Sequence, residues 1–264
     1  MNINEALVKG RLGLNSLEVE ILLSFVLNKP IIELYKNPYC ELKEDELRSF
    51  EKLILERKKG VPLEYLTGQT EFMGLLFKIT KDVLIPRKET EILTSEAIKE
   101  AEKIKSPRII DVGCGSGAIA ISIKKFLPSP CVFATDICEK ALLVSKMNAK
   151  MHNVRIHFIR SLILSAIKGK FDIIVSNPPY VETNLVLEYE PKIALDGGPS
   201  GLDFYPRIFE EARHLLKKDG LLILEIGQGK RGAISEIAKN HNFSLKRIVK
   251  DYSDIERILI LGMQ

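Results

Sequence analysis

The spacing of apolar residues at the start of the chain predicts a small domain of short helices. Asn15 and Glu18 are spaced as a capping box, and the apolar residues beside them recur at helical spacing: Leu17, Ile21, Leu22, Phe25 and Val26. Residues 28–30, Asn-Lys-Pro, should end that helix. A further helix is expected over 43–59, with Gly60 as its stop signal and an inward apolar face formed by Leu47, Phe50, Leu53 and Ile54. These apolar stripes indicate packed helix faces rather than a cofactor site.

The pattern then changes to strands that alternate with helices. Residues 68–85 alternate enough to predict a β-hairpin, and a helix is expected from Thr90 or Glu91 to Lys105. Apolar runs separated by helical segments predict strands near 108–112, 131–135, 154–159, 171–176 and 220–226. Two last strands, near 243–249 and 256–262, flank a turn and should pair antiparallel. This order predicts a doubly wound α/β sheet.

These patterns divide the chain into three parts. We expect a small helical domain over 1–66, a β-hairpin linker over 67–86 and a larger α/β domain over 87–264. A length of 264 residues has room for such an α/β domain with a small second domain. The apolar content of 45% suffices for a packed core, and no run approaches the roughly 18 apolar residues that span a bilayer.

The distribution of charge argues against a strong nucleic-acid interaction. The net charge is +4, but the first 66 residues hold 10 Lys and Arg against 11 Asp and Glu. A DNA-reading domain should carry a basic face, and this one is nearly neutral. The four cysteines, Cys40, Cys114, Cys131 and Cys138, show neither metal-site spacing nor a disulfide framework, which indicates reduced thiols in a cytoplasm. The four histidines are scattered without ligand spacing, so no metal is expected.

Asn177-Pro178-Pro179-Tyr180 carries the strongest chemical signal. The segment follows the apolar run 171–176, and two consecutive prolines cannot donate hydrogen bonds to a sheet, so the strand must end there. The Asn177 side chain and the Pro178 carbonyl then remain as acceptors at the carboxyl edge of the sheet, where open α/β folds bind ligands. Two neighbouring acceptors suit an NH₂ group. The structural alternative is a Pro-Pro turn that only closes the strand.

Such a grip has a chemical purpose. Amide and aromatic amino groups are poor nucleophiles, because their lone pairs are delocalised into a neighbouring π system. Hydrogen bonds to both N–H groups can aim the lone pair at an electrophile without a formal base.

A glycine-rich loop indicates a cofactor site. The strand near 108–112 leads into a helical run through Asp111, Val112, Gly113, Cys114, Gly115, Ser116 and Gly117. Closely spaced glycines bring backbone N–H groups and a helix N-terminus close to a ligand. Asp136 follows 23 residues after Gly113 at the end of the next strand, where a carboxylate can accept both ribose hydroxyls. The glycine pattern is Asp-x-Gly-x-Gly-x-Gly rather than the Gly-x-Gly-x-x-Gly of dinucleotide-binding enzymes. Together with the Asn-Pro-Pro-Tyr segment, it favours S-adenosylmethionine over a nicotinamide cofactor.

Three residues near these motifs have alternative roles. Asp111 is either a structural cap of the glycine loop or a partner of the cofactor's ammonium group. Cys114 is expected to fill the loop as a small side chain rather than act as a nucleophile. Glu225, at the end of a strand, is expected to organise a loop.

Several further segments make the chain resemble the HemK/PrmC family, protein methyltransferases that modify the glutamine of the Gly-Gly-Gln motif in class 1 peptide-chain release factors. Residues 85–91, Ile-Pro-Arg-Lys-Glu-Thr-Glu, are close to that family's IPRPETE loop. Other matching segments are 60–68, 72–77, 189–191, 194–198 and 201–205. The resemblance covers about 60–264, and the first 59 residues match only as a helical segment of suitable size.

The resemblance implies a class I, Rossmann-like methyltransferase fold with a seven-stranded, mostly parallel sheet, preceded by a small helical domain and a β-hairpin linker. It implies that the glycine loop wraps the cofactor's methionine portion, that Asp136 holds the ribose, and that Tyr180 packs against the substrate amide. The expected cofactor-binding residues are Asp111, Gly113, Cys114, Gly115, Ser116, Gly117, Asp136 and Asn177. The expected catalytic residues are Asn177, Pro178 and Tyr180, and the substrate-binding residues are Asn177, Pro178, Pro179 and Tyr180.

The chain departs from the family pattern at three places. Leu162 and Ile163 stand where members often have an acid and a bulky aromatic residue near the adenine. The link from Tyr180 to Tyr189 is shorter than usual, and residues 199–200, Pro-Ser, replace a more acidic pair.

We therefore predict methyl transfer from S-adenosylmethionine to the side-chain amide nitrogen of a release-factor glutamine, with S-adenosylhomocysteine as the product. The enzyme is expected to be a cytoplasmic monomer without a metal, a membrane partner or a stable nucleic-acid partner. The alternative substrate is an exocyclic amino group of adenine or guanine in DNA or RNA, because such enzymes also use an Asn-Pro-Pro-aromatic grip and flip the base. The near-neutral first domain counts against it. A third hypothesis is a catalytically silent cofactor-binding adaptor, although every expected reactive position is filled.

Overall fold

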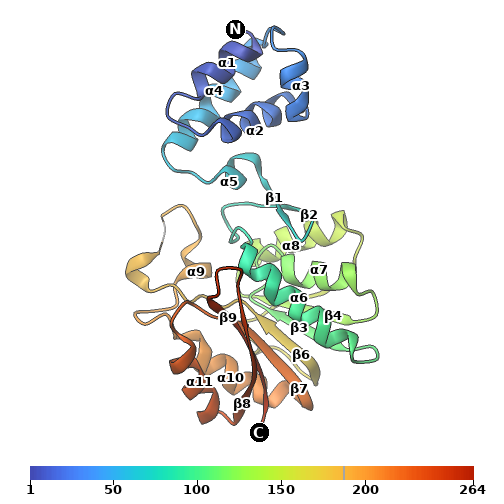
Figure 1. Cartoon of the computed structure of the whole chain (residues 1–264). Coiled ribbons are helices and arrows are strands. Elements are labelled where there is room, and N and C mark those ends of the chain that lie inside the picture. The colour runs from blue at the N-terminus through green and yellow to red at the C-terminus, as the bar shows by residue number, and fades with distance from the viewer. Residues whose placement is uncertain (187) are drawn as a thin grey trace. The chain divides into compact units, whose positions relative to one another are not determined.

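A computed structural model describes residues 1–186 and 188–264. Leu187, in the link from Tyr180 to Tyr189, lies outside the described residues. The chain divides into two compact units, Met1–Gln69 and Thr70–Gln264 (Figure 1), and each is described by itself.

The first unit is built from helices around its own apolar core. They are α1 (Ile3–Gly10), α2 (Ser16–Leu27), α3 (Ile31–Lys36), α4 (Glu44–Lys58) and α5 (Leu63–Thr67). The core combines residues from α1 to α4: Ile3, Ala6, Leu7, Val19, Leu22, Leu23, Leu34, Phe50 and Ile54. Burial of this shared face stabilises helices that are too short to be stable alone.

The capping box expected at the start of α2 is wrong. Asn15 does cap the helix, but its side chain accepts from the backbone N–H of Leu17 at 2.9 Å. Glu18 does not return the bond, because its carboxylate accepts from the Arg57 guanidinium on α4 at 2.7 Å. A capping box instead begins α1, where Asn2 and Glu5 bond each other's backbone N–H groups.

In the described part of the second unit, a seven-stranded sheet has the order β5-β4-β3-β6-β7-β9-β8. Its strands are β3 (Arg108–Val112), β4 (Cys131–Asp136), β5 (His157–Arg160), β6 (Phe171–Ser176), β7 (Leu216–Glu225), β8 (Phe243–Lys250) and β9 (Glu256–Met263). Strands β3 to β7 pair in parallel, and β9 pairs antiparallel with both β7 and β8. The predicted fold class is confirmed.

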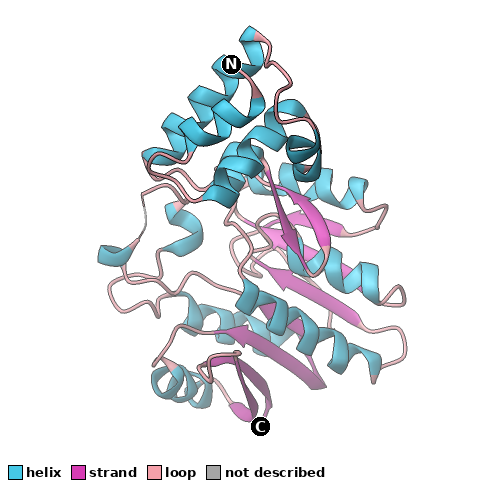
Figure 2. Cartoon of the chain, turned by 45° about the horizontal axis from the view of Figure 1, so that its top comes forward, coloured by secondary structure: helices cyan, strands magenta, loops and turns pink. Residues whose placement is uncertain are grey.

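The predicted hairpin forms a separate two-stranded sheet, β1 (Gln69–Phe72) and β2 (Leu75–Lys78) (Figure 2). Asn148 fixes β2 to the rest of the unit, because its side-chain amide bonds both the N–H and the carbonyl of Lys78. The same amide donates to the carbonyl of Ser116 at 2.9 Å, which links the hairpin to the glycine loop.

Helices cover both faces of the sheet. One apolar layer packs α6 (Lys88–Glu102), α7 (Ala118–Phe126) and α8 (Glu139–Met151) on the sheet, and the other packs α10 (Phe204–Leu215) and α11 (Arg231–Asn240) (Figure 1). The short helices η1 (Thr183–Leu185) and α9 (Lys192–Leu195) lie in the connection between β6 and α10. Within the described ranges, no helix is long and apolar enough to cross a membrane.

Several boundaries differ from the predicted ones for local reasons. Strand β5 begins three residues late, because the backbone N–H of Val154 still bonds Ala149 in the last turn of α8. Strand β7 begins at Leu216 rather than 220, because Leu216 already pairs with Phe171 before a register shift.

The sheet order decides where the site forms. Because β3 lies between β4 and β6 in parallel register, the loops after Val112, Asp136 and Ser176 leave the same edge side by side. These are the loops that hold the glycine motif, the acid and the Asn-Pro-Pro-Tyr segment.

Candidate active site

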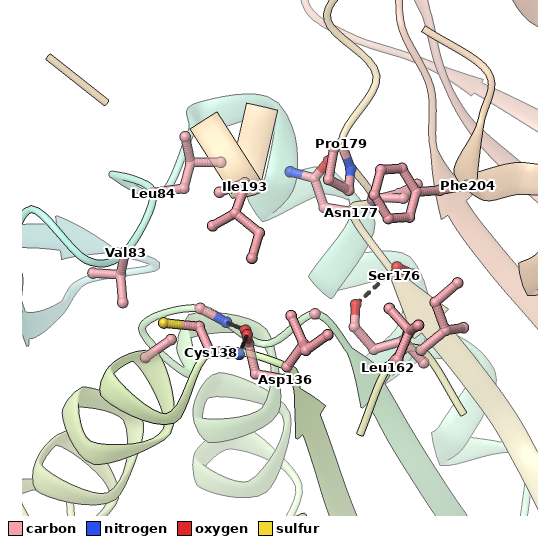
Figure 3. A pocket seen from close by; sticks show the side chains of 18 of the residues that line it. Val83, Leu84, Asp136, Cys138, Leu162, Ser176, Asn177, Pro179, Ile193 and Phe204 are labelled. Carbon is pink, nitrogen blue, oxygen red and sulfur yellow. Dashed lines mark hydrogen bonds between the residues drawn. The ribbon is translucent and has the colours of Figure 1, made fainter. Parts of the chain in front are cut away.

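A pocket opens at the carboxyl edge of β3, β4 and β6 (Figure 3). Six expected site residues line it: Gly113, Gly115, Asp136, Asn177, Pro178 and Pro179. Its remaining walls are largely apolar and include Val83, Leu84, Ile137, Leu162, Ile163, Ile193, Phe204 and Ile208. The pocket therefore combines a few polar groups with an apolar cradle, which is typical of small-molecule sites.

Gly113 and Gly115 leave space on the pocket side of the loop. Both have positive φ, +74° and +54°, which favours glycine. A Cβ atom built on either would meet no atom of the described residues within 4 Å. Gly117 differs, because a Cβ there would lie 2.9 Å from the Ile121 side chain. The first two glycines thus keep a cavity open, whereas the third serves close packing.

Asp136 is held rigidly at the end of β4. One carboxylate oxygen accepts from the backbone N–H of Gly115 and the other from that of Cys138, each at 2.9 Å. Burial raises the pKa of Asp136, while these backbone bonds oppose the shift. Each carboxylate oxygen keeps a further acceptor site for a ligand hydroxyl.

Asp111 lies behind the loop and is fully buried. Its Oδ2 accepts from the backbone N–H of Ala120 at 3.2 Å, so it caps the first turn of α7. Its Oδ1 has no hydrogen-bond partner in the part of the chain that the structure describes. Burial raises the pKa of Asp111 from 3.8 to about 7. The structural role left open by the sequence is therefore present, and one buried oxygen remains unpaired.

The other loop residues support the loop from within. Cys114 is buried in the apolar layer, 3.5 Å from the Ser145 hydroxyl, and burial raises the pKa of its thiol. The Ser145 hydroxyl donates to the carbonyl of Gly115 at 2.7 Å, which fixes the loop from α8. Ser116 is also buried, and its carbonyl accepts from Asn148 as described above. These residues shape the loop rather than line the cavity.

Asn177 begins a buried chain of hydrogen bonds. Its Nδ2 donates to the hydroxyl of Thr90 on α6 at 3.1 Å, and that hydroxyl donates to Glu225 Oε2 at 2.7 Å. The Tyr180 hydroxyl donates to the other Glu225 oxygen at 3.0 Å. Both ends of the Asn-Pro-Pro-Tyr segment therefore meet at one carboxylate, and the phenol of Tyr180 is turned toward it.

A glycine-rich segment packs against the backbone of Asn-Pro-Pro-Tyr. A Cβ at Gly197 would lie 2.8 Å from the Pro179 carbonyl oxygen, and one at Gly201 would lie 2.3 Å from that of Tyr180. Lys230 closes this region by bonding Glu182 and the carbonyl of Ser200. The loop after β6 is thus held by close backbone contact.

Several residues in or beside the pocket were not expected from the sequence. Cys138, Ile193 and Phe204 line it but were not identified as site residues. Thr90, which bonds Asn177 from behind the lining, was identified only as the start of a helix. Thr90 lies in the Ile-Pro-Arg-Lys-Glu-Thr-Glu segment, which could have signalled a role, whereas the apolar residues look like any others. In the two described ranges, no cluster of three or more His, Cys, Asp or Glu side chains could hold a metal ion.

Comparisons with known proteins show which families and folds the chain resembles. Residues 88–243 match the family described as methyltransferase small domain, and residues 4–68 match the PrmC N-terminal domain. A release factor glutamine methyltransferase from Clostridium acetobutylicum is 38% identical, and the match covers 98% of each chain. One from Moorella thermoacetica is 37% identical over 92% of this chain and 90% of its own. The solved structure of a methyltransferase from Pyrococcus furiosus is 20% identical, with a TM-score of 0.56 over 80% of this chain and 96% of that one.

Proposed function

The chain belongs to the family of release factor glutamine methyltransferases, and on this basis we propose that it methylates the side-chain amide nitrogen of the glutamine in the Gly-Gly-Gln motif of class 1 release factors. The methyl donor in this proposal is S-adenosylmethionine, and the product is S-adenosylhomocysteine. The observation that carries the proposal is the orientation of the Asn177 amide in the lining of the pocket.

The residues at the edge of β3 and β4 suit this cofactor. The open sides of Gly113 and Gly115 leave room for its amino-acid portion, and the fixed Asp136 carboxylate can accept from two ribose hydroxyls. The apolar walls at Leu162 and Phe204 suit the adenine ring. When bound, the cofactor supplies an electrophilic methyl group on a sulfonium that is its own leaving group.

The substrate amide would be oriented by Asn177 and Pro178. Asn177 uses its Nδ2 on Thr90, so its Oδ1 is the atom that can accept from a ligand. This oxygen would accept one hydrogen of the glutamine NH₂ group, and the Pro178 carbonyl would accept the other. We propose that Pro179 and the Tyr180 ring complete the grip around the flat amide. With both hydrogens held, the nitrogen lone pair points at the reacting carbon and no formal base is needed.

We propose that the unit Met1–Gln69 docks the release factor, since its match to the PrmC N-terminal domain covers most of it. The proposed boundaries are a docking domain over 1–66, a linker over 67–86 and a catalytic domain over 87–264. We also propose that the enzyme acts as a monomer in the cytoplasm, where translation terminates, without a metal and without a stable nucleic-acid or membrane partner.

The test is mass spectrometry of a class 1 release factor after incubation with the full-length enzyme and S-adenosylmethionine carrying a deuterated methyl group. We expect one labelled methyl group on the Gly-Gly-Gln glutamine and none on a Gln→Ala release factor. Asn177→Ala should lower the rate by roughly 10²–10³, as expected for losing one preorganised hydrogen-bonding group. Labelling of duplex DNA or ribosomal RNA, with none on release factor, would establish the nucleic-acid alternative instead.

A further inference from the structure

The buried chain from Asn177 to Glu225 has a direction that follows from its chemistry. An ionised carboxylate can only accept hydrogen bonds, so Thr90 must donate its single hydroxyl hydrogen to Glu225. The Thr90 oxygen can then only accept from Asn177, which it does from Nδ2. The Asn177 amide therefore cannot be turned over without losing this bond, and its oxygen is kept on the other side.

The position of this chain favours a role beyond stability. Thr90 and Glu225 are almost fully buried, at 4% and 0% exposure, and they come from α6 and β7 rather than from the strands that hold the cofactor loop. The Tyr180 hydroxyl bonds the same carboxylate, and that of Tyr205 bonds the Glu225 backbone carbonyl at 3.1 Å. One carboxylate thus fixes both ends of the Asn-Pro-Pro-Tyr segment.

We propose that Glu225, acting through Thr90, determines which atom of the Asn177 amide faces the substrate, so that Thr90 and Glu225 are positioning residues for methyl transfer. The inference rests on the proposed function, since it assumes that Asn177 Oδ1 accepts from the substrate NH₂ group. Reversing the hydrogen-bond direction at Thr90 would present the Asn177 NH₂ group to the substrate NH₂ group, and two donors cannot bond each other.

Protonation of Glu225 is one way to reverse the direction. Burial raises the pKa of Glu225 from 4.5 to about 7, and the bonds from Thr90 and Tyr180 oppose the shift. Two charged groups also act on it: Glu89 on α6 raises its pKa, and Arg257 on β9, which pairs with Asp251, lowers it. A protonated carboxyl can donate to Thr90, and Thr90 can then donate to Asn177 Oδ1. Because ionised Glu225 sets the productive direction, kcat should rise as the pH increases through about 7.

The chain offers a matched control for Thr90. Thr94 lies one turn later on α6, is 0% exposed, and donates its hydroxyl to the Thr90 carbonyl at 2.9 Å. Thr94→Val therefore removes an equally buried hydroxyl from the same helix without touching the chain to Glu225. Any effect of Thr90→Val beyond that of Thr94→Val reports on the hydrogen-bond direction rather than on burial.

The experiment compares kcat, KM for release factor and the Kd for S-adenosylhomocysteine in wild type, Thr90→Val, Thr90→Ser, Glu225→Gln and Thr94→Val. Thr90→Val should lower kcat about tenfold or more, with cofactor affinity unchanged and the hydroxyl of Thr90→Ser restoring most of the rate. Glu225→Gln keeps the shape but cannot gain or lose a proton, so its kcat should be independent of pH from about 6 to 8. Equal kcat in Thr90→Val and Thr94→Val, or a wild-type kcat and pH profile in Glu225→Gln, would overturn the proposal.

A second measurement needs no substrate. With ¹⁵N-asparagine labelling and Asn177→Ala to identify the signal, the Asn177 NH₂ protons should be protected from exchange in wild type and in Thr94→Val, and exposed in Thr90→Val. Unchanged protection in Thr90→Val would refute the hydrogen-bond chain itself. Wild type that fails to methylate release factor while showing this protection would refute the proposed function and leave the chain intact.

Discussion

Gly115→Ala gives the sharpest separation of ligand binding from folding in this protein. Gly115 has φ of +54°, and a Cβ there would meet no described atom within 4 Å. The substitution therefore causes no clash in the free protein and costs only backbone strain. If the cofactor occupies this open space, the added methyl group should lower cofactor affinity through a steric clash that is absent from the free protein.

Gly229 provides the matched control. Its φ is +77°, and a Cβ there also meets nothing within 4 Å among the described residues, yet it does not line the pocket. An alanine in this left-handed region costs about 1–2 kcal/mol, and the loss of chain freedom in the unfolded state returns about 0.4–1 kcal/mol. Both variants should thus lose about 1 kcal/mol of free energy of unfolding.

The two variants should differ in cofactor affinity. Overfilling a packed contact by one methyl group costs about 1–3 kcal/mol, which corresponds to a Kd about 5- to 150-fold higher. We expect this increase for Gly115→Ala and none for Gly229→Ala. Isothermal titration with S-adenosylhomocysteine measures the affinity, and urea unfolding measures the stability. Wild-type affinity in Gly115→Ala, or an equal loss in Gly229→Ala, would refute the assignment of this space.

Three further predictions concern the supporting residues. Asp111→Asn should change how the free energy of unfolding depends on pH. Because the pKa of Asp111 is raised in the folded protein, the folded wild type holds a proton that the unfolded chain releases between about pH 4 and 7, so wild type should lose about 4 kcal/mol of stability relative to the variant as pH rises across this interval. Urea unfolding at several pH values measures this, and parallel curves for the two proteins would contradict it. Asp136→Ala should abolish most of the rise in thermal midpoint that S-adenosylhomocysteine gives wild type, and an undiminished rise would exclude it as the ribose partner. Gly201→Ala should cost a few kcal/mol more than Gly229→Ala in urea unfolding, because its Cβ would lie 2.3 Å from the Tyr180 carbonyl oxygen, and equal costs would mean that the contact relaxes freely.

The fold was largely predictable because its strands are short apolar runs with clear ends. The prolines at 178 and 179 predicted the end of β6, and Asp136 predicted the end of β4. In the structure β6 ends at Ser176 and β4 at Asp136. The errors lie where tertiary contacts compete with local signals. Glu18 is spaced for a capping box with Asn15, but the Arg57 guanidinium on α4 takes its carboxylate, and no local pattern reveals a partner 39 residues away.

The sequence predicted polar motifs that the structure brings to one pocket, but it did not predict the residues that support them. Asn177 and the glycine loop were identified because few structural roles require such residues at such spacing. Asn148 was missed, although its amide joins β2 to the loop through Lys78 and Ser116, because an asparagine on a helix looks like a surface residue. The partners of a buried amide depend on segments that only the tertiary fold brings together.

The order of the strands explains how these roles can be divided. The glycine loop and Asp136 follow β3 and β4, while Asn177 follows β6, which lies on the other side of β3. Glu225 ends β7, the next strand, and so reaches Tyr180 and, through Thr90, Asn177. Asn177 is neutral, so it can accept a hydrogen bond from an amide without the electrostatic attraction by which a carboxylate would stabilise the bound cationic cofactor before reaction. In the proposed site, the Glu225 carboxylate that orients Asn177 lies one strand further away, where its charge would act on the amide through hydrogen bonds rather than directly on the sulfonium.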